Sequence, residues 1–400
     1  MISLTWYQCI AVFATTTLVT LVLTPFALRL ALRRGIVDRP DAIKLQSSPV
    51  PYLGGLAIVL AFSLVVVGAA LVDHPYNGIG LLAVVLGTGL GLSILGVIDD
   101  IWTLGPWIRL FFEAGAGVIV WVSGTRVEIF AGHFRGGRAI DAVITVVWVV
   151  GITNAFNILD NMDGLSAGIA AIASLGLFVV AYTNGQYLVA VLALALVGCA
   201  VGFLRHNFHP ATIYMGDAGS LYLGFLLSVL CLRLRTYEVV RISFIVPILL
   251  LGVAIFDTVL VSATRILNGR NPFAGGRDHT SHRLVFLGFS VKSSVALIYA
   301  AGVASAWLAI IASRIDRPNV YLLGGLALAM ALFFGILLAR LPIYAQQSSK
   351  MPVPLHQETP SSPDVDASIQ AASDPDVQLD SRAAPIRQRS ERRESLQQKS

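Results

Sequence analysis

Long runs of apolar residues recur along most of the chain, and short polar segments separate them. Most of these runs approach the roughly 20 helical residues that cross a bilayer core. The pattern predicts about eleven membrane-spanning helices, because closed barrels show short alternating segments instead. We expect the spans at 7–31, 53–72, 79–98, 107–122, 144–152, 165–182, 187–204, 221–234, 242–266, 290–313 and 320–341. The expected fold is an all-α polytopic integral membrane protein.

Charges at the ends of the spans set the predicted orientation. Basic residues cluster just after the first span: Arg29, Arg33, Arg34, Arg39 and Lys44. Cytoplasmic loops carry an excess of Lys and Arg, so this loop is expected inside and the N-terminus outside. Short alternation over 125–142 predicts an external hairpin, although its three arginines run against the charge rule. The polar loops near 99, 160, 217 and 280 then share the cytoplasmic face.

Composition separates a membrane domain from a tail. Of the 400 residues, 56% are hydrophobic and only 13% charged, whereas soluble domains average about 25% charged. We expect a membrane domain over 1–344 and a disordered cytoplasmic tail over 345–400, because the tail lacks aromatic residues. Cys9, Cys199 and Cys231 have no paired spacing and are expected to be small buried side chains. No nucleic-acid partner is expected, only membrane lipid and a small-molecule substrate.

One polar segment, NAFNILDNMDGL at 154–165, lies between two apolar runs. Its polar side chains recur every third position: Asn154, Asn157, Asp160 and Asp163. Such steps stay near one helix face but drift through about 180° over the segment. We therefore predict that the helix ends near Asn161 and that Gly164 turns the chain, bringing Asp163 back towards Asp160. A solvated loop without chemistry is the alternative, but regular amide and carboxylate spacing favours a site.

Further polar side chains fall on the same predicted face. They are Asp99, Asp100, Asp217, His279, His282, Arg39 and Lys44. Carboxylates beside cations at a membrane surface suggest a magnesium site for a phosphorylated substrate. Magnesium takes few carboxylates and leaves positions for water and phosphate oxygens, while Lys and Arg bind the outer oxygens.

Each of these residues also has a structural alternative. Asp217 is placed to cap the span that follows it. His279 and His282 make a poor zinc set, because no Cys accompanies their three-residue spacing. Asp257, deep in the ninth predicted span, is equally compatible with a partner inside the bundle and with function.

Taken together, these motifs resemble the polyprenyl-phosphate N-acetylhexosamine-1-phosphate transferases over residues 1–340. Five motifs carry the resemblance in order: DRP…K…PVPYLGG at 38–55, Asp99-Asp100, NAFNILDNMDGL at 154–165, MGDAGS at 215–220 and PF…RDHTSHRL at 272–284. The last motif is similar to the His-x-His-His-Arg pattern of the N-acetylglucosamine branch. Ser281 replaces its middle histidine, and Ile43 and Gln46 depart from the first motif.

The resemblance implies a reaction in which undecaprenyl phosphate attacks the β-phosphorus of a UDP-N-acetylhexosamine and releases UMP. It implies Mg²⁺, with Mn²⁺ as an alternative, at the cytoplasmic face of a bacterial cytoplasmic membrane; a homodimer is compatible with it. The implied catalytic residues are Asp99, Asp100, Asp160, Asp163, His279 and His282. The implied metal ligands are Asp217 and Asp160, and the implied substrate contacts are Lys44, Asn154, Asn157 and Arg283. Asp99 is expected to act as a base or to hold the lipid phosphate or metal.

Two other functions compete with this one. The muramoyl-pentapeptide transferase of peptidoglycan synthesis shares the motifs, but its branch has three consecutive histidines. A transporter for an anionic substrate would also place polar groups in a membrane bundle. Transporters bind near the midplane and often repeat their halves, whereas here the polar groups gather at one face and no repeat is visible.

Overall fold

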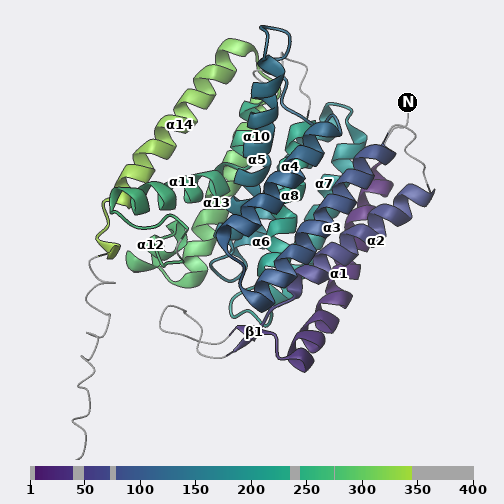
Figure 1. Cartoon of the computed structure of the whole chain (residues 1–400), viewed down its shortest axis with the longest axis vertical. Helices are drawn as coiled ribbons and strands as arrows, with labels where there is room; N and C mark the ends of the chain where they lie inside the picture. Colours follow the sequence, from purple (N-terminus) through teal and green to yellow (C-terminus); the bar gives the residue numbers. More distant parts are fainter. Residues whose placement is uncertain (1–4, 39–48, 73–77, 235–243, 274, 345–400) are drawn as a thin grey trace, which may run out of the picture. The chain divides into compact units, whose positions relative to one another are not determined.

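The computed structural model describes residues 5–38, 49–72, 78–234, 244–273 and 275–344. In this part of the chain helices dominate (Figure 1), and nine of them are long and apolar enough to cross a membrane. The protein is thus a multi-pass membrane protein. The helices before the centre of the chain are α1 (Trp6–Arg34), α2 (Gly54–Val72), α3 (Ile79–Trp102), α4 (Pro106–Val122), α5 (Gly137–Leu159), α6 (Leu165–Thr183) and α7 (Tyr187–Asn207). Those that follow are α8 (Gly216–Arg233), α10 (Ile245–Leu250), α11 (Gly252–Leu267), α12 (Thr280–Phe286), α13 (Val291–Ala312) and α14 (Arg317–Ala339).

The predicted count of about eleven spans is not confirmed. Helix α4 has 17 residues, at the lower limit of what crosses a bilayer. The ninth predicted span is broken at Leu251 into the separate helices α10 and α11. At this break Ser305 of α13 donates its hydroxyl to the carbonyl of Leu249 at 2.6 Å. A carbonyl near a helix end needs such a partner in an apolar setting, so the break is stabilised from outside the helix.

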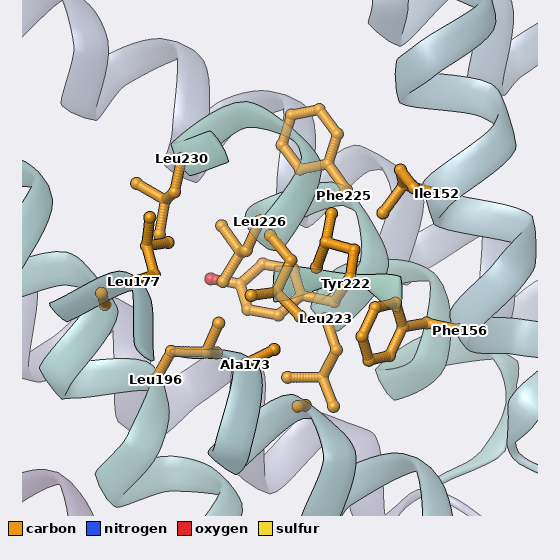
Figure 2. Packing of buried hydrophobic residues seen from close by; sticks show 14 of the residues in the cluster. Ile152, Phe156, Ala173, Leu177, Leu196, Tyr222, Leu223, Phe225, Leu226 and Leu230 are labelled. Atoms are coloured by element: carbon orange, nitrogen blue, oxygen red, sulfur yellow. The ribbon is translucent and has the colours of Figure 1, made fainter. Parts of the chain in front are cut away.

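Helix α8 is the centre of the bundle. Of its most apolar stretch 83% is buried, against none of the corresponding stretch of α14. Figure 2 shows Tyr222, Leu223, Phe225 and Leu226 of α8 among apolar side chains of α5, α6 and α7, including Phe156. Helix α8 is therefore shielded from lipid on most sides, while α14 presents large apolar side chains outward.

Small residues let α3 approach α8 closely. A Cβ atom added at Gly96 would lie only 2.4 Å from the backbone nitrogen of Ala218. Backbones can approach this closely only where a glycine faces the contact. The approach brings the end of α3, with Asp99 and Asp100, beside the start of α8, with Asp217.

The first polar loop is extended where it is described. Strand β1 (Val37–Asp38) pairs antiparallel with β2 (Val50–Pro51), and Tyr214 donates its backbone N–H to Pro51 at 2.8 Å. These residues of the loop are therefore extended rather than helical. Arg39 and Lys44 lie outside the described residues, as does the 345–400 tail, so its predicted disorder stays a prediction.

The predicted hairpin over 125–142 is wrong. Residues 125–136 form irregular segments, bends and turns without strands, and α5 already begins at Gly137. The buried carboxylate of Asp141 organises the segment by accepting backbone N–H groups of Ile129, Phe130 and Ala131 at 3.2, 3.1 and 2.7 Å. These hydrogen bonds satisfy backbone N–H groups of the segment without a strand ladder.

Candidate active site

A cavity of about 560 Å³ lies where the ends of α3, α5 and α8 meet. It brings together most of the predicted site residues: Asp99, Asp100, Asn157, Asp160, Asp163, Asp217 and His282. It also contains residues that the sequence analysis did not select: Asp38, Tyr52, Arg109, Asn161, Asn207, His209, Tyr214 and Arg277. The convergence of the acidic motifs, expected from topology alone, is confirmed by the geometry.

Asp99 and Asp100, the acidic pair at the end of α3, bind to different neighbouring segments. Asp99 accepts the backbone N–H of Leu104 at 2.5 Å, and its other oxygen lies 2.8 Å from Arg109. Asp100 accepts the backbone N–H of Asp217 at 3.0 Å. Asp99 is thus tied to α4 and Asp100 to α8, so adjacent residues face different parts of the cavity wall.

Arg109 contacts three polar side chains of the site. Its guanidinium lies 2.8 Å from Asp99 and 3.2 Å from Asp217, and it donates to the amide oxygen of Asn157 at 2.6 Å. One arginine thereby joins α3, α5 and α8 from its position on α4. The sequence carried a signal for it, because a charged residue within an apolar helix is usually functional.

The turn after α5 follows the prediction. The helix ends at Leu159, and Gly164 adopts a left-handed backbone conformation with φ of +75°. Burial, with added repulsion from Asp100 and Asp163, raises the pKa of Asp160 to about 7. Asp160 is therefore only partly ionised at neutral pH, and a bound cation would favour its charged form.

Asp163 is held by the loop that precedes α8. It accepts the backbone N–H of Ala211 at 3.0 Å and lies 2.8 Å from Nδ1 of His209. Nearby, buried Asn207 accepts the N–H of Gly164 and donates to the carbonyl of Ile213, both at 3.0 Å. The two polar loops of the cavity are therefore one hydrogen-bonded unit.

Asp217 does not cap α8. The residue at the N-cap position is Met215, and no side chain caps this helix end. The carboxylate of Asp217 instead accepts from Asn157 at 2.7 Å and from Arg109 at 3.2 Å. Gly216, with φ of +71°, makes room here, since a Cβ atom on it would lie 2.5 Å from Oδ2 of Asp100.

Three predicted residues do not reach the cavity wall. Asn154 donates to Glu113 of α4 and to the carbonyl of Val150. His279 is buried with Nδ1 3.0 Å from Asp257. Arg283 is fully buried. The sequence was compatible with either a structural or a functional role for Asp257. In the structure Asp257 holds the loop before α12, because it accepts hydrogen bonds from His279 and, at 2.6 Å, from the backbone N–H of Thr280.

The guanidinium of Arg283 binds other parts of the protein and does not face the cavity. Its guanidinium donates to the carbonyls of Asp278 and Leu338, each at 2.7 Å, and to the hydroxyl of Thr264 at 3.0 Å. The expectation that it contacts substrate has no support in this geometry, since a sequence motif does not show where a long side chain finds its acceptors. Arg283 instead fastens the loop before α12 to α11 and α14.

His282 is the member of the histidine loop that faces the cavity. Burial, and after it the neighbouring His279 and Arg277, lowers the pKa of His282 to about 4. It is therefore neutral at physiological pH, with one ring nitrogen to donate and one to accept. Next to it, Ser281 donates its hydroxyl to Asn161 at 2.6 Å, which joins the histidine loop to the turn after α5.

Tyr344, the last described residue, belongs to the network that supports this loop. Its hydroxyl donates to Asp278 at 2.8 Å, and Asp278 also accepts twice from Arg265 at 2.8 and 2.7 Å. These bonds keep the pKa of Asp278 below its usual range despite burial. Tyr344 therefore helps to hold the loop before α12.

This network predicts where the chain can be shortened. A chain ending at Tyr344 should keep in full the transfer activity that the resemblance implies, whereas one ending at Arg340 should lose roughly tenfold, because a slightly misplaced loop is costly in catalysis. Initial rates of UMP release from both purified variants measure the effect. Equal activity of the two truncations would contradict the supporting role, and loss of activity in the longer one would give the tail a catalytic part.

The cavity wall has the donor chemistry that magnesium prefers. Asp100 Oδ2 is buried and accepts no hydrogen bond from any described residue. Within the described ranges, no three acidic, His or Cys side chains lie close enough to form a ready-made ion cage. Magnesium is commonly held by one or two carboxylates together with water and substrate phosphates. The residues present fit an ion held in that way.

Known proteins match the part of the chain that contains most of the cavity's acidic residues. The profile of Glycosyl transferase family 4 matches residues 82–235, the segment from α3 to α8 that carries most of the acidic wall. A Bacillus subtilis protein named probable undecaprenyl-phosphate N-acetylglucosaminyl 1-phosphate transferase is 34% identical over 299 residues, covering 74% of this chain and 82% of the relative.

More distant relatives extend the comparison. The decaprenyl-phosphate N-acetylglucosaminephosphotransferase of Mycolicibacterium smegmatis is 29% identical, covering 74% of this chain and 79% of the relative. The undecaprenyl-phosphate alpha-N-acetylglucosaminyl 1-phosphate transferase of Escherichia coli K12 is 23% identical, covering 72% and 79%. The extent and identity of the Bacillus match, together with the order of the motifs, show that this chain belongs to glycosyl transferase family 4.

Proposed function

We propose that this protein transfers N-acetylglucosamine 1-phosphate from UDP-N-acetylglucosamine to undecaprenyl phosphate. The products are undecaprenyl-diphospho-N-acetylglucosamine and UMP, and the step starts synthesis of a cell-envelope polysaccharide. The observation that carries the proposal is the cluster of Asp99, Asp100, Asp160 and Asp217 around Arg109 in one cavity of an apolar bundle. The names of the related transferases support the same acceptor and sugar.

The proposed setting is the cytoplasmic face of the bacterial cytoplasmic membrane. Arg33 and Arg34 at the end of α1 favour this orientation by the charge rule. Trp102 and Trp107, close in sequence to Asp99 and Arg109, are 70% and 75% exposed, as tryptophans are at a membrane interface. A lipid acceptor and a water-soluble donor can meet at such a boundary.

We propose Asp217 and Asp160 as ligands of a magnesium ion, with Asp100 beside them; manganese is an alternative. The ion would neutralise charge on the donor diphosphate. Carboxylates gathered in a partly buried cavity repel one another, and a cation relieves that repulsion. Burial, and after it repulsion from Asp100 and Asp163, raises the pKa of Asp160 to about 7, and a bound cation would favour its charged form.

The protein side chains position the reactants. Arg109 would bind phosphate oxygens in exchange for part of its carboxylate contacts, since guanidinium groups pair well with phosphate. Asp99 would orient Arg109 and the acceptor phosphate. That phosphate is largely ionised near pH 7, because its pKa is about 6, so a general base is not required. Phosphoryl transfer depends mostly on such positioning and charge neutralisation.

Other residues complete the proposed site. Neutral His282 would donate one hydrogen bond to the UDP-sugar, either to the phosphate attached to the sugar or to the sugar itself. Asn157 contacts both Arg109 and Asp217 and would hold these two side chains in position relative to each other. Lys44 stays a predicted diphosphate contact outside the described residues. A homodimer also stays a prediction, which mass measurement in detergent checks.

A donor panel tests the function. Purified protein in detergent with magnesium and undecaprenyl phosphate should release UMP from UDP-N-acetylglucosamine, or from its N-acetylgalactosamine epimer, and poorly from UDP-glucose. A site that reads the acetamide by buried hydrogen bonds rejects analogues lacking it, often by about 10⁴-fold. Preference for UDP-muramoyl-pentapeptide would place the protein in the peptidoglycan branch. Preference for glucose would overturn the acetamide argument.

A further inference from the structure

Helix α4 carries two charged side chains in an otherwise apolar sequence. They are Arg109 and Glu113, four residues apart and so on one face of the helix. Arg109 belongs to the cavity wall, but Glu113 does not line the cavity. Glu113 is completely buried, and its Oε1 has no hydrogen-bond partner among the described residues.

Both side chains meet asparagines of α5. Arg109 donates to Asn157 at 2.6 Å, and Glu113 accepts from the amide of Asn154. The asparagines are three residues apart and share a face of α5. Two polar contacts, one turn apart on each helix, therefore cross the interface in antiparallel register.

The contact between Glu113 and Asn154 costs free energy, because it keeps a carboxylate buried. A carboxylate buried among apolar helices loses hydration, and a hydrophobic side chain of similar size would usually be no worse for stability. Close packing already exists one turn further along α4, where a Cβ atom added at Gly117 would lie 3.0 Å from the backbone of Val146. Packing at Gly117 thus already brings α4 and α5 close together without the polar contact.

We propose that Glu113 and Asn154 are positioning residues for the transfer reaction. Their contact fixes the rotation of α4 against α5 and thereby holds Arg109 between Asp99 and Asp217. The inference rests on the proposed role of Arg109 in phosphate binding. It gives Asn154 a task in the interface in place of the substrate contact expected from sequence.

Single variants test the positioning. Glu113→Ala and Asn154→Ala should each lower kcat by 10- to 100-fold, the loss expected from a small misplacement of a catalytic group, with a smaller change in KM. Glu113→Gln keeps an acceptor for Asn154 and should restore most of the activity. Thr153→Val is a matched control, because Thr153 is buried on α5 and its hydroxyl has no partner among the described residues. Thermal midpoints are measured for all four variants.

A double-mutant cycle shows whether Glu113 acts through Arg109. If it does, Glu113→Ala combined with Arg109→Ala should be no slower than Arg109→Ala alone. Full activity of Glu113→Ala, additive losses, or failure of Glu113→Gln to restore activity would each overturn the inference. A fully active Arg109→Ala would instead overturn the proposed role of Arg109, so the two failures are distinguishable.

Discussion

Asp217→Asn should reduce UMP release at least about 100-fold, the usual loss when one transition-state charge contact is removed. The amide keeps the size of the carboxylate, and its single oxygen can still accept from one of the two donors, Asn157 or Arg109, which lie 2.7 and 3.2 Å from different oxygens of Asp217. It cannot neutralise a magnesium ion. The variant should therefore fold normally and fail in catalysis.

The measurement is the initial rate over a magnesium titration, with thermal unfolding in detergent as the test of folding. Asp316→Asn is the matched control, because Asp316 is exposed at the start of α14 and far along the chain from the acidic motifs. Near-normal turnover of Asp217→Asn at limiting magnesium would remove Asp217 from the proposed metal site.

Arg109→Met should also cost on the order of 100-fold in kcat/KM. Methionine retains much of the packing of the side chain but leaves Asp99, Asp217 and Asn157 without the donor that joins them. Arg109→Lys should recover part of the rate, because an ammonium keeps the charge but lacks the planar fork that contacts several oxygens at once.

Arg126→Met is the control for this change. Arg126 pairs with Glu128 at 2.9 Å, and both side chains are about two-fifths exposed. Exposed pairs of this kind contribute little, roughly 0–1 kcal/mol. Equal activity of Arg109→Met and Arg126→Met would show that Arg109 does not take part in transfer.

Patterns within one segment were enough to predict several features correctly. Apolar runs mark the helices because a bilayer-spanning segment must satisfy its own backbone bonds. The drift of the polar positions after 154, together with Gly164, predicted the end of α5 and the turn. Alternation of spans then placed the ends of α3, α5 and α8 on one side, where the cavity brings Asp99, Asp160 and Asp217 together.

Partners from distant segments decided the rest. The break at Leu251 depends on a hydroxyl from α13, and the loop after residue 125 depends on Asp141. Arg283 and Arg109 are both arginines within helices of the bundle. Arg283 is bonded to backbone carbonyls, whereas Arg109 lies between carboxylates in the cavity.

By itself, the sequence determined most of the long apolar helices, the side of the bundle that carries the acidic residues and the class of reaction they suggest. Only the tertiary structure decided which charged side chains reach the cavity and which hold its walls. The physical reason is that helical periodicity is a local property, whereas a buried polar group must find its partner wherever the packed helices present one. Arg109, Glu113 and Asn207 have their roles because residues far along the chain meet them.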